Sequence, residues 1–270
     1  MKKNRAFLKW AGGKYPLIED ICHHLPKGDC LIEPFVGAGS VFLNTNYDRY
    51  ILADINNDLI NLYNTVKDYT EDFIRDARGL FANNTSTPQV YYLLRNEFNL
   101  CTDSYRRAVL FLYLNRHCYN GLCRYNSNGE FNVPFGRYKN PYFPEIELYK
   151  FAEKANQALF LCEHYQQTLS KAKPGSVVYC DPPYVPLSTT ANFTAYHTNN
   201  FNLTEQQNLA LLACQLAKES RIPVLISNHD TALTREWYGE AMLHYVTVRR
   251  TISCNILHRS SVNELLALYL

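Results

Sequence analysis

The architecture of this chain is most clearly indicated by Val177-Val178-Tyr179-Cys180-Asp181-Pro182-Pro183-Tyr184. The four residues before the acid form an apolar run, which predicts a buried strand over residues 177–181. Two prolines then end the strand, because neither can donate an N–H group to a sheet. The turn presents a carboxylate, backbone carbonyls and an aromatic ring at a sheet's carboxyl edge. We expect this set to hold a flat heterocycle with an exocyclic NH2 group, whose hydrogens the carboxylate and a carbonyl accept while the tyrosine stacks on the ring.

A glycine-rich segment lies upstream. Residues 29–33 read as a first strand, followed by Phe35-Val36-Gly37-Ala38-Gly39-Ser40 and the apolar residues 41–43. Strand, glycine turn and helix in that order are typical of a nucleotide-binding α/β unit. Residues 50–54 read as a second strand ending in Asp54, whose two oxygens suit two ribose hydroxyl groups. The sequence has no third glycine at the dinucleotide spacing and no GxxxxGKS/T phosphate loop, so we expect a nucleoside without a long phosphate tail.

The remaining pattern favours an α/β fold with an insertion. Residues 57–99 and 106–116 have helical periodicity without alternating strands, so this part interrupts the sheet's connectivity. Within it, Asn128-Gly129 lies between aromatic-rich flanks and predicts a β-hairpin. Residues 184–202 are long, polar and irregular, which is typical of a mobile active-site loop. Further strands are predicted at residues 159–163, 224–228, 245–252 and 262–269, with a helix over 209–216.

The composition excludes several classes of protein. Of 270 residues, 47% are hydrophobic, but no run of about 18 apolar residues predicts a membrane span. The basic start has no apolar segment behind it, so we expect no secretory signal. Nine scattered cysteines favour a reduced cytosolic compartment and no metal site. The net charge of +2 conceals basic segments at residues 1–14 and 104–144. Such clustering indicates a polyanionic partner, although it also fits solvated basic faces.

Four stretches together resemble the DNA adenine-N6 methyltransferases of the Dam group of bacteria and their phages. They are Phe7-Leu8-Lys9-Trp10-Ala11-Gly12-Gly13-Lys14, Glu33-Pro34-Phe35-Val36-Gly37-Ala38-Gly39-Ser40, Asp54 and Asp181-Pro182-Pro183-Tyr184, in the family's order. The resemblance covers nearly the whole chain. It implies a Rossmann-like S-adenosylmethionine-dependent core at residues 1–56 and 145–270, with a mostly parallel seven-stranded sheet, and a target-recognition insert at residues 57–144. It further implies S-adenosylmethionine as methyl donor, duplex DNA containing GATC as substrate, a monomer, and action in the cytoplasm, at the nucleoid or in a phage's host.

The resemblance also assigns roles to single residues. Asp181 and the Pro182 carbonyl would accept the two hydrogens of adenine N6 and localise its lone pair, while Tyr184 stacks on the ring. A base paired in a duplex cannot enter such a pocket, so the adenine must be flipped out. Asp181 would also border the methionine end of the cofactor. The other expected cofactor-binding residues are Trp10, Lys14, Phe35, Gly37, Gly39 and Asp54.

Recognition of the DNA sequence falls to the insert. Arg124 on the predicted hairpin is the candidate for a bidentate contact to guanine, with a phosphate contact as the alternative. Leu122 and Pro134 are expected at thymine methyl groups, and Tyr119 and Asn120 at the gap left by the flipped base. Phosphate contacts position the protein without specifying a sequence. They are expected from Arg116, Arg137 and Lys139, while Lys9 fits either role.

Three alternatives share part of this pattern. A related adenine methylase reading another site would keep every motif, and a catalytically silent DNA-binding regulator would keep the basic insert. A glutamine-N5 protein methyltransferase would carry Asn in place of Asp181. One departure from the family pattern occurs at residues 253–261, where two glycines are replaced by Ile256 and Leu257 and a basic pair by Ser260 and Ser261. If that loop approaches DNA, we expect lower affinity or processivity but retained activity.

Overall fold

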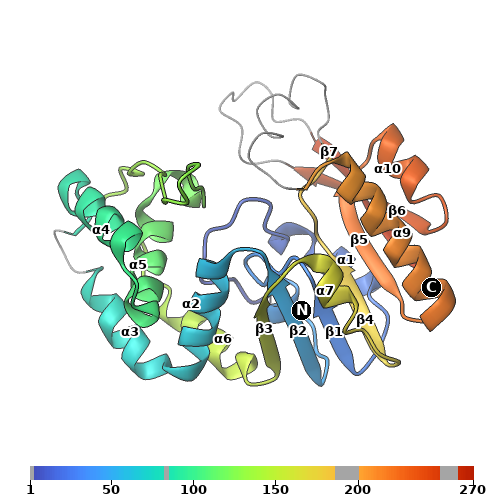
Figure 1. Ribbon diagram of the computed structural model, residues 1–270, viewed down its shortest axis with the longest axis horizontal. Coiled ribbons are helices and arrows are strands. Elements are labelled where there is room, and N and C mark those ends of the chain that lie inside the picture. The colour runs from blue at the N-terminus through green and yellow to red at the C-terminus, as the bar shows by residue number, and fades with distance from the viewer. Residues whose placement is uncertain (1–2, 82–84, 186–200, 250–260) are drawn as a thin grey trace. The chain divides into compact units, whose positions relative to one another are not determined.

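The fold is built on one mixed β-sheet (Figure 1). The computed structural model describes residues 3–81, 85–185, 201–249 and 261–270. β1 pairs in parallel with β2 and β4, and β4 with β5, whereas β7 is antiparallel to β5 and β6. The predicted α/β class with a mostly parallel seven-stranded sheet is confirmed. Within the described residues the strand order is β3 (Ala158–Cys162), β2 (Arg49–Asp54), β1 (Cys30–Glu33), β4 (Ser176–Cys180), β5 (Val224–His229), β7 (Ser261–Tyr269) and β6 (Met242–Arg249).

Most strand predictions are confirmed to within two residues at each end. The exception is β6, which begins at Met242 rather than at residue 245. Residues 250–252 of that prediction lie outside the described residues. The strands β1, β4 and β5 are buried along their whole length, as expected for central strands covered on both faces.

Parallel pairing aligns the carboxyl ends of three central strands. In the register, Glu33 of β1 pairs with Leu52 of β2, and Ile32 of β1 with Val178 of β4. The segments that follow β2, β1 and β4 therefore start from the same edge of the sheet. In open α/β sheets this is the edge at which ligands bind.

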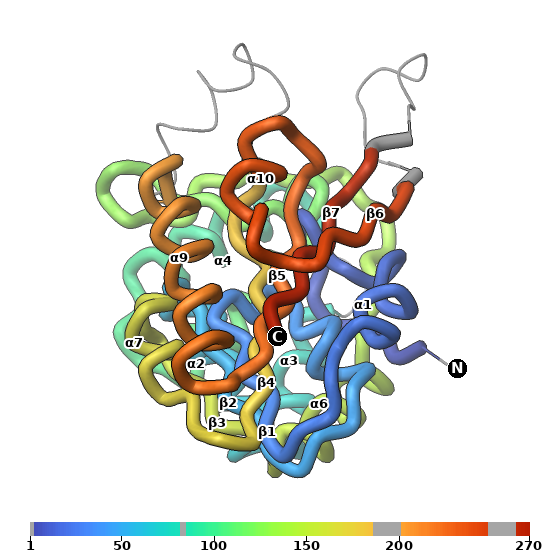
Figure 2. The backbone as a smooth tube through the Cα atoms, turned by 90° about the vertical axis from the view of Figure 1, so that its right-hand side faces the viewer, coloured from blue at the N-terminus to red at the C-terminus, as the bar shows by residue number. Residues whose placement is uncertain are grey.

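The chain divides into two compact units. The first comprises Met1–Tyr15, Val36–Asn44 and Ala53–Glu163, and the second Pro16–Phe35, Thr45–Leu52 and His164–Leu270. Within the second unit, α7 (Tyr165–Leu169) and α9 (Leu203–Ser220) cover one face of the strands and α1 (Ile18–His24) covers the other (Figures 1 and 2). Leu209, Ala213 and Ala217 repeat at four-residue spacing on α9, so one stripe of this helix packs into the core. The turn η1 (Tyr15–Leu17) precedes α1, and the short helix α10 (Ala232–Trp237) follows β5.

The first unit is largely helical, as its periodicity predicts. The helix α5 forms its centre, since Ala108 to Asn115 are buried without interruption. Asn56, Thr87 and Asp103 each cap a helix by accepting a backbone N–H group with the side chain. Whether residues 57–144 act as a separate recognition domain stays a prediction. The helices are α2 (Asn57–Asp68), α3 (Thr70–Gly79), α4 (Pro88–Leu100), α5 (Ser104–His117) and α6 (Glu145–Ala155), with the short turn η3 (Tyr119–Gly121).

The predicted hairpin is present, although its ladder is short. Tyr125 and Phe131 form an antiparallel bridge around a turn in which Gly129 N–H donates to the Asn126 carbonyl at 3.0 Å. Gly129 has φ of +75°, a conformation that glycine adopts without a steric cost.

The sequence predicts a helix after the glycine turn, and this prediction is wrong. Only a single 3-10 turn, η2 (Phe42–Asn44), follows the glycines. Asn44 accounts for the early end: its side chain donates to the Ser40 carbonyl at 2.8 Å and the Asn4 carbonyl at 2.9 Å, and accepts from Asn4 N–H. Such side-chain bonds compete with the helical backbone pattern.

None of the helices in the described part of the chain is both long and apolar enough to span a bilayer.

Candidate active site

The glycine turn after β1 has a left-handed backbone at two positions, a conformation that glycine adopts without a steric cost. Gly37 and Gly39 have φ of +45° and +69°. A Cβ atom on Gly37 would lie 3.0 Å from Trp10 Nε1, closer than side chains normally pack. Val36 N–H donates to the Ala53 carbonyl at 2.8 Å, and the Tyr63 hydroxyl donates to the Gly37 carbonyl. Trp10 and the glycine turn are therefore brought together, as the prediction of one cofactor site requires.

Asp54 faces this turn. Its Oδ2 accepts the Gly37 N–H at 3.2 Å, and its Oδ1 accepts the Asn56 N–H at 3.0 Å. Burial raises the pKa of Asp54, and the backbone N–H groups of Asn56 and Gly37 oppose that rise. The result is a carboxylate fixed beside a glycine turn, an arrangement suited to a ribose diol.

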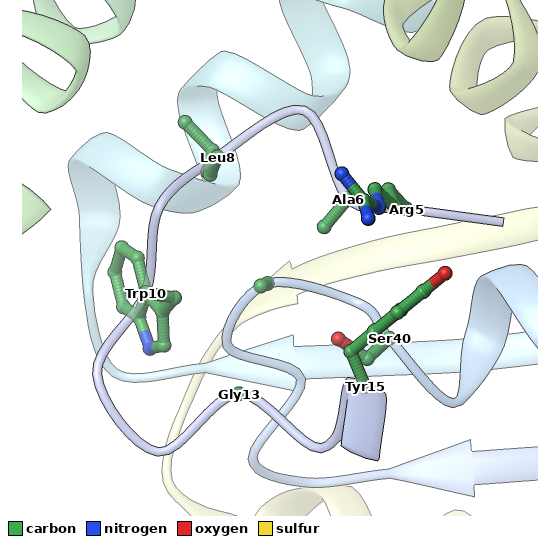
Figure 3. A pocket seen from close by; sticks show the side chains of 8 residues that line it. Arg5, Ala6, Leu8, Trp10, Gly13, Tyr15 and Ser40 are labelled. Carbon is green, nitrogen blue, oxygen red and sulfur yellow. The ribbon is translucent and has the colours of Figure 1, made fainter. Parts of the chain in front are cut away.

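A pocket of about 280 Å³ opens beside the turn within the same unit (Figure 3). Trp10, predicted to hold the cofactor, lies on its wall. Lys14, the other predicted residue of the N-terminal motif, is not part of that wall. It is buried, and its Nζ donates to the Gly12 carbonyl at 2.7 Å. The lining residues are Arg5, Ala6, Leu8, Trp10, Gly13, Tyr15, Ala38 and Ser40.

In the second unit, Asp181 and Tyr184 leave the end of β4 with fixed side chains. The Ser227 hydroxyl donates to Asp181 Oδ1 at 3.1 Å, and Ser227 is itself bonded to the Tyr179 hydroxyl at 2.9 Å. The Tyr184 hydroxyl donates to Glu264 Oε2 at 2.6 Å. Burial raises the pKa of Tyr184 far above its ordinary value, so its ring stays a neutral phenol. A carboxylate and an oriented aromatic ring thus stand at one turn, as predicted.

The two prolines of the turn have different surroundings. Pro182 is buried, and within the described residues no donor reaches its carbonyl oxygen. The Pro183 carbonyl instead accepts a hydrogen bond from Gln206 Nε2. The Pro182 carbonyl is thus the acceptor that matches the predicted bond to an amine. Phe35, also predicted at the cofactor, stacks on Tyr165 with ring centroids 5.6 Å apart.

The predicted DNA contacts of the first unit lie on exposed loops. Arg124 is exposed on the hairpin, where its Nε donates to Asn132 Oδ1 at 2.7 Å. Tyr119 N–H donates to the Pro134 carbonyl at 2.8 Å, so these two predicted residues lie side by side. Asn120 is exposed with φ of +54°, and Leu122 is partly buried. The last two, Arg137 and Lys139, are both exposed.

Lys9 and Arg116 form a compact basic pair. Lys9 Nζ lies 3.9 Å from the centroid of the Tyr138 ring and donates to the Arg116 carbonyl at 3.4 Å. Burial, and secondly the charge of Arg116, lowers the pKa of Lys9. Arg116 Nε donates to the Tyr142 carbonyl at 3.1 Å. The two neighbouring cations repel one another. An anionic ligand bound beside them would relieve this repulsion, so the pair suits such a ligand.

Four polar residues near the Asp181 turn were missed by the sequence prediction: Gln206, Ser227, Asn228 and Glu264. The sequence does mark Ser227 and Asn228, because they are two polar residues directly after the apolar run of β5. This strand is the neighbour of β4, so polar side chains at its end can reach the Asp181 turn. The next residue of β5, His229, bonds the Val185 carbonyl through Nδ1 at 2.7 Å. The predicted mobile loop, apart from its first and last residues, and the departure at residues 253–260 lie outside the described residues.

Known proteins resemble this chain in sequence over its whole length. Residues 10–252 match the family model of the D12 class N6 adenine-specific DNA methyltransferases. The chain is 73% identical over 269 residues to the DNA adenine methylase of Serratia marcescens, covering all of both chains. It is 68% identical to that of Escherichia coli strain K12 and 57% to that of Vibrio cholerae, covering 96% and 97% of those proteins. Among solved structures, a precorrin 8w decarboxylase of Methanobacterium thermoautotrophicum covers both chains fully, but with 8% identity and a TM-score of 0.40 it carries no argument.

Proposed function

Because this chain belongs to the D12 class of N6 adenine-specific DNA methyltransferases and is a DNA adenine methylase, we propose its methyl donor, its target sequence and its catalytic and binding residues. The donor is S-adenosylmethionine, the target is the adenine of GATC in duplex DNA, and the enzyme acts as a monomer. The relatives named above are DNA adenine methylases at up to 73% identity over the whole chain, which supports carrying the predicted motif roles to this sequence.

The chemistry proposed for the Asp181 turn addresses the weak nucleophilicity of adenine N6, whose lone pair is delocalised into the ring. Asp181 and the Pro182 carbonyl accept the two N6 hydrogens, which localises the lone pair on nitrogen. Asp181 need not be a strong base, because the N6 proton becomes acidic only as the C–N bond forms. Tyr184, oriented by Glu264, holds the ring by stacking. S-adenosylmethionine, when bound, supplies a methyl group activated by sulfonium.

The residues of the glycine turn fit a nucleoside cofactor. Asp54 is the proposed acceptor for two ribose hydroxyls, which is supported by the N–H bonds from Gly37 and Asn56 that fix its orientation. Gly37 and Gly39 allow the backbone to approach the ligand closely. Trp10 lines the adjoining pocket. The remaining members of the proposed cofactor set are Lys14, Phe35 and Asp181.

For DNA, the exposed loops of the first unit are proposed to supply recognition. Arg124 contacts guanine, and Leu122 and Pro134 contact thymine methyl groups. Tyr119 and Asn120 fill the space of the flipped adenine. The phosphate contacts, which position the duplex without reading its sequence, come from Lys9, Arg116, Arg137 and Lys139.

One observation supports the catalytic assignment above the others. Asp181 is oriented through Ser227 at a turn where the Pro182 carbonyl has no donor among the described residues. Plasmid DNA from a methylase-negative host expressing the chain tests the target. We expect protection from a nuclease blocked by GATC methylation, and no protection from Asp181→Ala. Protection at another sequence alone would indicate a methylase with a different target, and full protection by Asp181→Ala would remove Asp181 from the mechanism.

Arg124→Ala tests the base contact. Loss of a bidentate contact to guanine costs about 1–3 kcal/mol of discrimination at one base pair. We expect the ratio of methylation rates between GATC and a site altered at that guanine to fall about 5- to 160-fold, measured by competition. A uniform loss over all sequences with a shallower salt dependence would instead mark Arg124 as a phosphate contact.

A further inference from the structure

The turn that carries Asp181 and Tyr184 has little backbone support of its own. Its two prolines lack N–H groups, so the strand ladder cannot continue through them. Two residues later, however, Val185 is bonded on both sides. Its N–H donates to Asn228 Oδ1 at 3.1 Å, and its carbonyl is bonded by His229 Nδ1 at 2.7 Å. The turn is thus held by side chains from β5 rather than by a sheet ladder.

A second support comes from α9. Gln206 Nε2 donates to the Pro183 carbonyl, in the middle of the turn. Gln206 is 2% exposed and Asn228 is fully buried. Asn228 Nδ2 donates to Gln206 Oε1 at 3.0 Å and to the Tyr238 hydroxyl at 2.9 Å. The supports at Pro183 and Val185 therefore belong to one buried network.

The bonds of this network fix the direction of each amide. Asn228 Oδ1 must be the acceptor, because two backbone N–H groups, those of Val185 and His229, point at it. Asn228 Nδ2 is then the donor to Gln206, so Gln206 Oε1 accepts and Gln206 Nε2 donates to Pro183. Each amide has one orientation only. A network satisfied in this way is rigid and resists displacement of the turn it holds.

We propose that Gln206, Asn228 and His229 are positioning residues that hold the Asp181–Tyr184 turn in the geometry needed for methyl transfer. The inference rests on the function proposed for Asp181 and Tyr184. His229 also packs edge-on against Tyr184, with ring centroids 4.7 Å apart, so the same network limits the motion of the stacking ring. A displacement of about 1 Å at a reacting centre lowers rates by about 100-fold, so loss of the network should act on the chemical step.

Gln206→Glu provides a switchable version of the network. When protonated, a glutamic acid has the shape of glutamine and can still donate to the Pro183 carbonyl while accepting from Asn228. When ionised, it has no donor left, and an acceptor oxygen faces the Pro183 carbonyl in place of the Nε2 donor. Burial favours the protonated form and moves its ionisation toward neutral pH. The single-turnover rate of Gln206→Glu, divided by that of the wild type, should fall at least tenfold between pH 6 and pH 8.5.

The matched control is Gln207→Glu, an exposed position of the same helix, whose rate ratio should stay constant with pH. Gln206→Met has a similar volume but can make neither bond, and should lose at least tenfold in single-turnover rate at every pH. Affinity for S-adenosylmethionine and for DNA should change less than threefold in both Gln206 variants, and circular dichroism should show a folded protein throughout. A purely structural role predicts instead lower melting temperatures with normal single-turnover rates.

The proposal is overturned if Gln206→Met transfers methyl groups at the wild-type rate, or if the Gln206→Glu ratio does not change with pH. Asp181→Ala in the same assay separates this from failure of the proposed function. If Asp181→Ala is inactive and the Gln206→Glu rate ratio does not change with pH, only the positioning role of the network is refuted. If Asp181→Ala is fully active, the catalytic role of Asp181 is refuted, and with it the basis of the positioning proposal.

Discussion

At the scale of single residues, Asp54 combines a fixed position with an electrostatic cost. Burial raises its pKa, while N–H bonds from Asn56 and Gly37 partly compensate. The carboxylate accepts hydrogen bonds with both oxygens, whereas the protonated acid gives up part of that capacity. The affinity of Asp54 for a ribose should therefore change with pH even in a range where an ordinary aspartate is already ionised.

Asp54→Asn tests this dependence. The amide cannot accept with both of its polar atoms, and hydrogen bonds to a charged group contribute about 1.5–3 kcal/mol. We expect affinity for S-adenosylmethionine to fall about 10- to 160-fold at pH 8, measured by calorimetry. Lowering the pH through the raised pKa should weaken binding to the wild type but not to Asp54→Asn.

The control for this titration is Asp68→Asn, an exposed aspartate at the end of α2, which should bind the cofactor as the wild type does. If Asp54→Asn keeps wild-type affinity at pH 8, the carboxylate does not hold the ribose.

Some residues of the site can be predicted from the sequence and others cannot. Asp54 and Asp181 each end an apolar run, so sequence alone places them at the end of a strand. Glu264 lies 80 residues from its partner Tyr184, and Gln206 lies 23 residues from Pro183. No local pattern marks such pairs, because only the packing of β7 and α9 against β5 brings them together.

At the scale of elements, the hairpin that carries Arg124 is anchored by a partly buried ion pair, in which Asp58 is the buried partner. The Tyr125 hydroxyl donates to Asp58 Oδ2 at 2.6 Å, and Arg107 binds both oxygens of Asp58. Asn56, the N-cap of α2, donates to Cys123 Sγ at 3.3 Å. The sequence indicated the hairpin through Asn128-Gly129, but not this anchor, whose groups come from separate helices.

Tyr125→Phe should loosen the hairpin without changing its exposed residues. Loss of this partly buried hydrogen bond to a charged group costs about 1.5–3 kcal/mol, which should appear in urea unfolding. Because Arg124 is the neighbouring residue, we also expect the preference for GATC over single-base variants to fall several-fold in competition assays.

Tyr105→Phe is a matched comparison, since the Tyr105 hydroxyl bonds the carboxylate of Asp76 at 2.8 Å on the surface. That change should cost less than about 1 kcal/mol and leave the preference unaltered, because exposed polar pairs contribute little. Equal effects from the two variants would contradict an anchoring role for Tyr125.

At the scale of the whole molecule, the response to acid should depend on a buried histidine. His117 is 1% exposed, its Nδ1 bonds the Tyr113 carbonyl at 2.8 Å, and its ring stacks on Tyr113. Burial lowers the pKa of His117 to about 4. Between that value and the ordinary pKa near 6.5, the unfolded chain binds a proton that the folded protein does not. Stability must therefore rise with pH across this window and fall as the solution is acidified.

The size of this effect is testable by urea unfolding of wild type and His117→Gln from pH 7 to pH 4. A pKa lowered by between two and three units corresponds to about 3 kcal/mol, lost progressively on acidification. His117→Gln should be less stable than the wild type at pH 7, because it loses ring packing, but should lose less stability on acidification. The exposed His23→Gln should follow the wild-type curve. Parallel curves for wild type and His117→Gln would show that His117 takes up its proton without unfolding, and acid sensitivity would then have to come from the carboxylates.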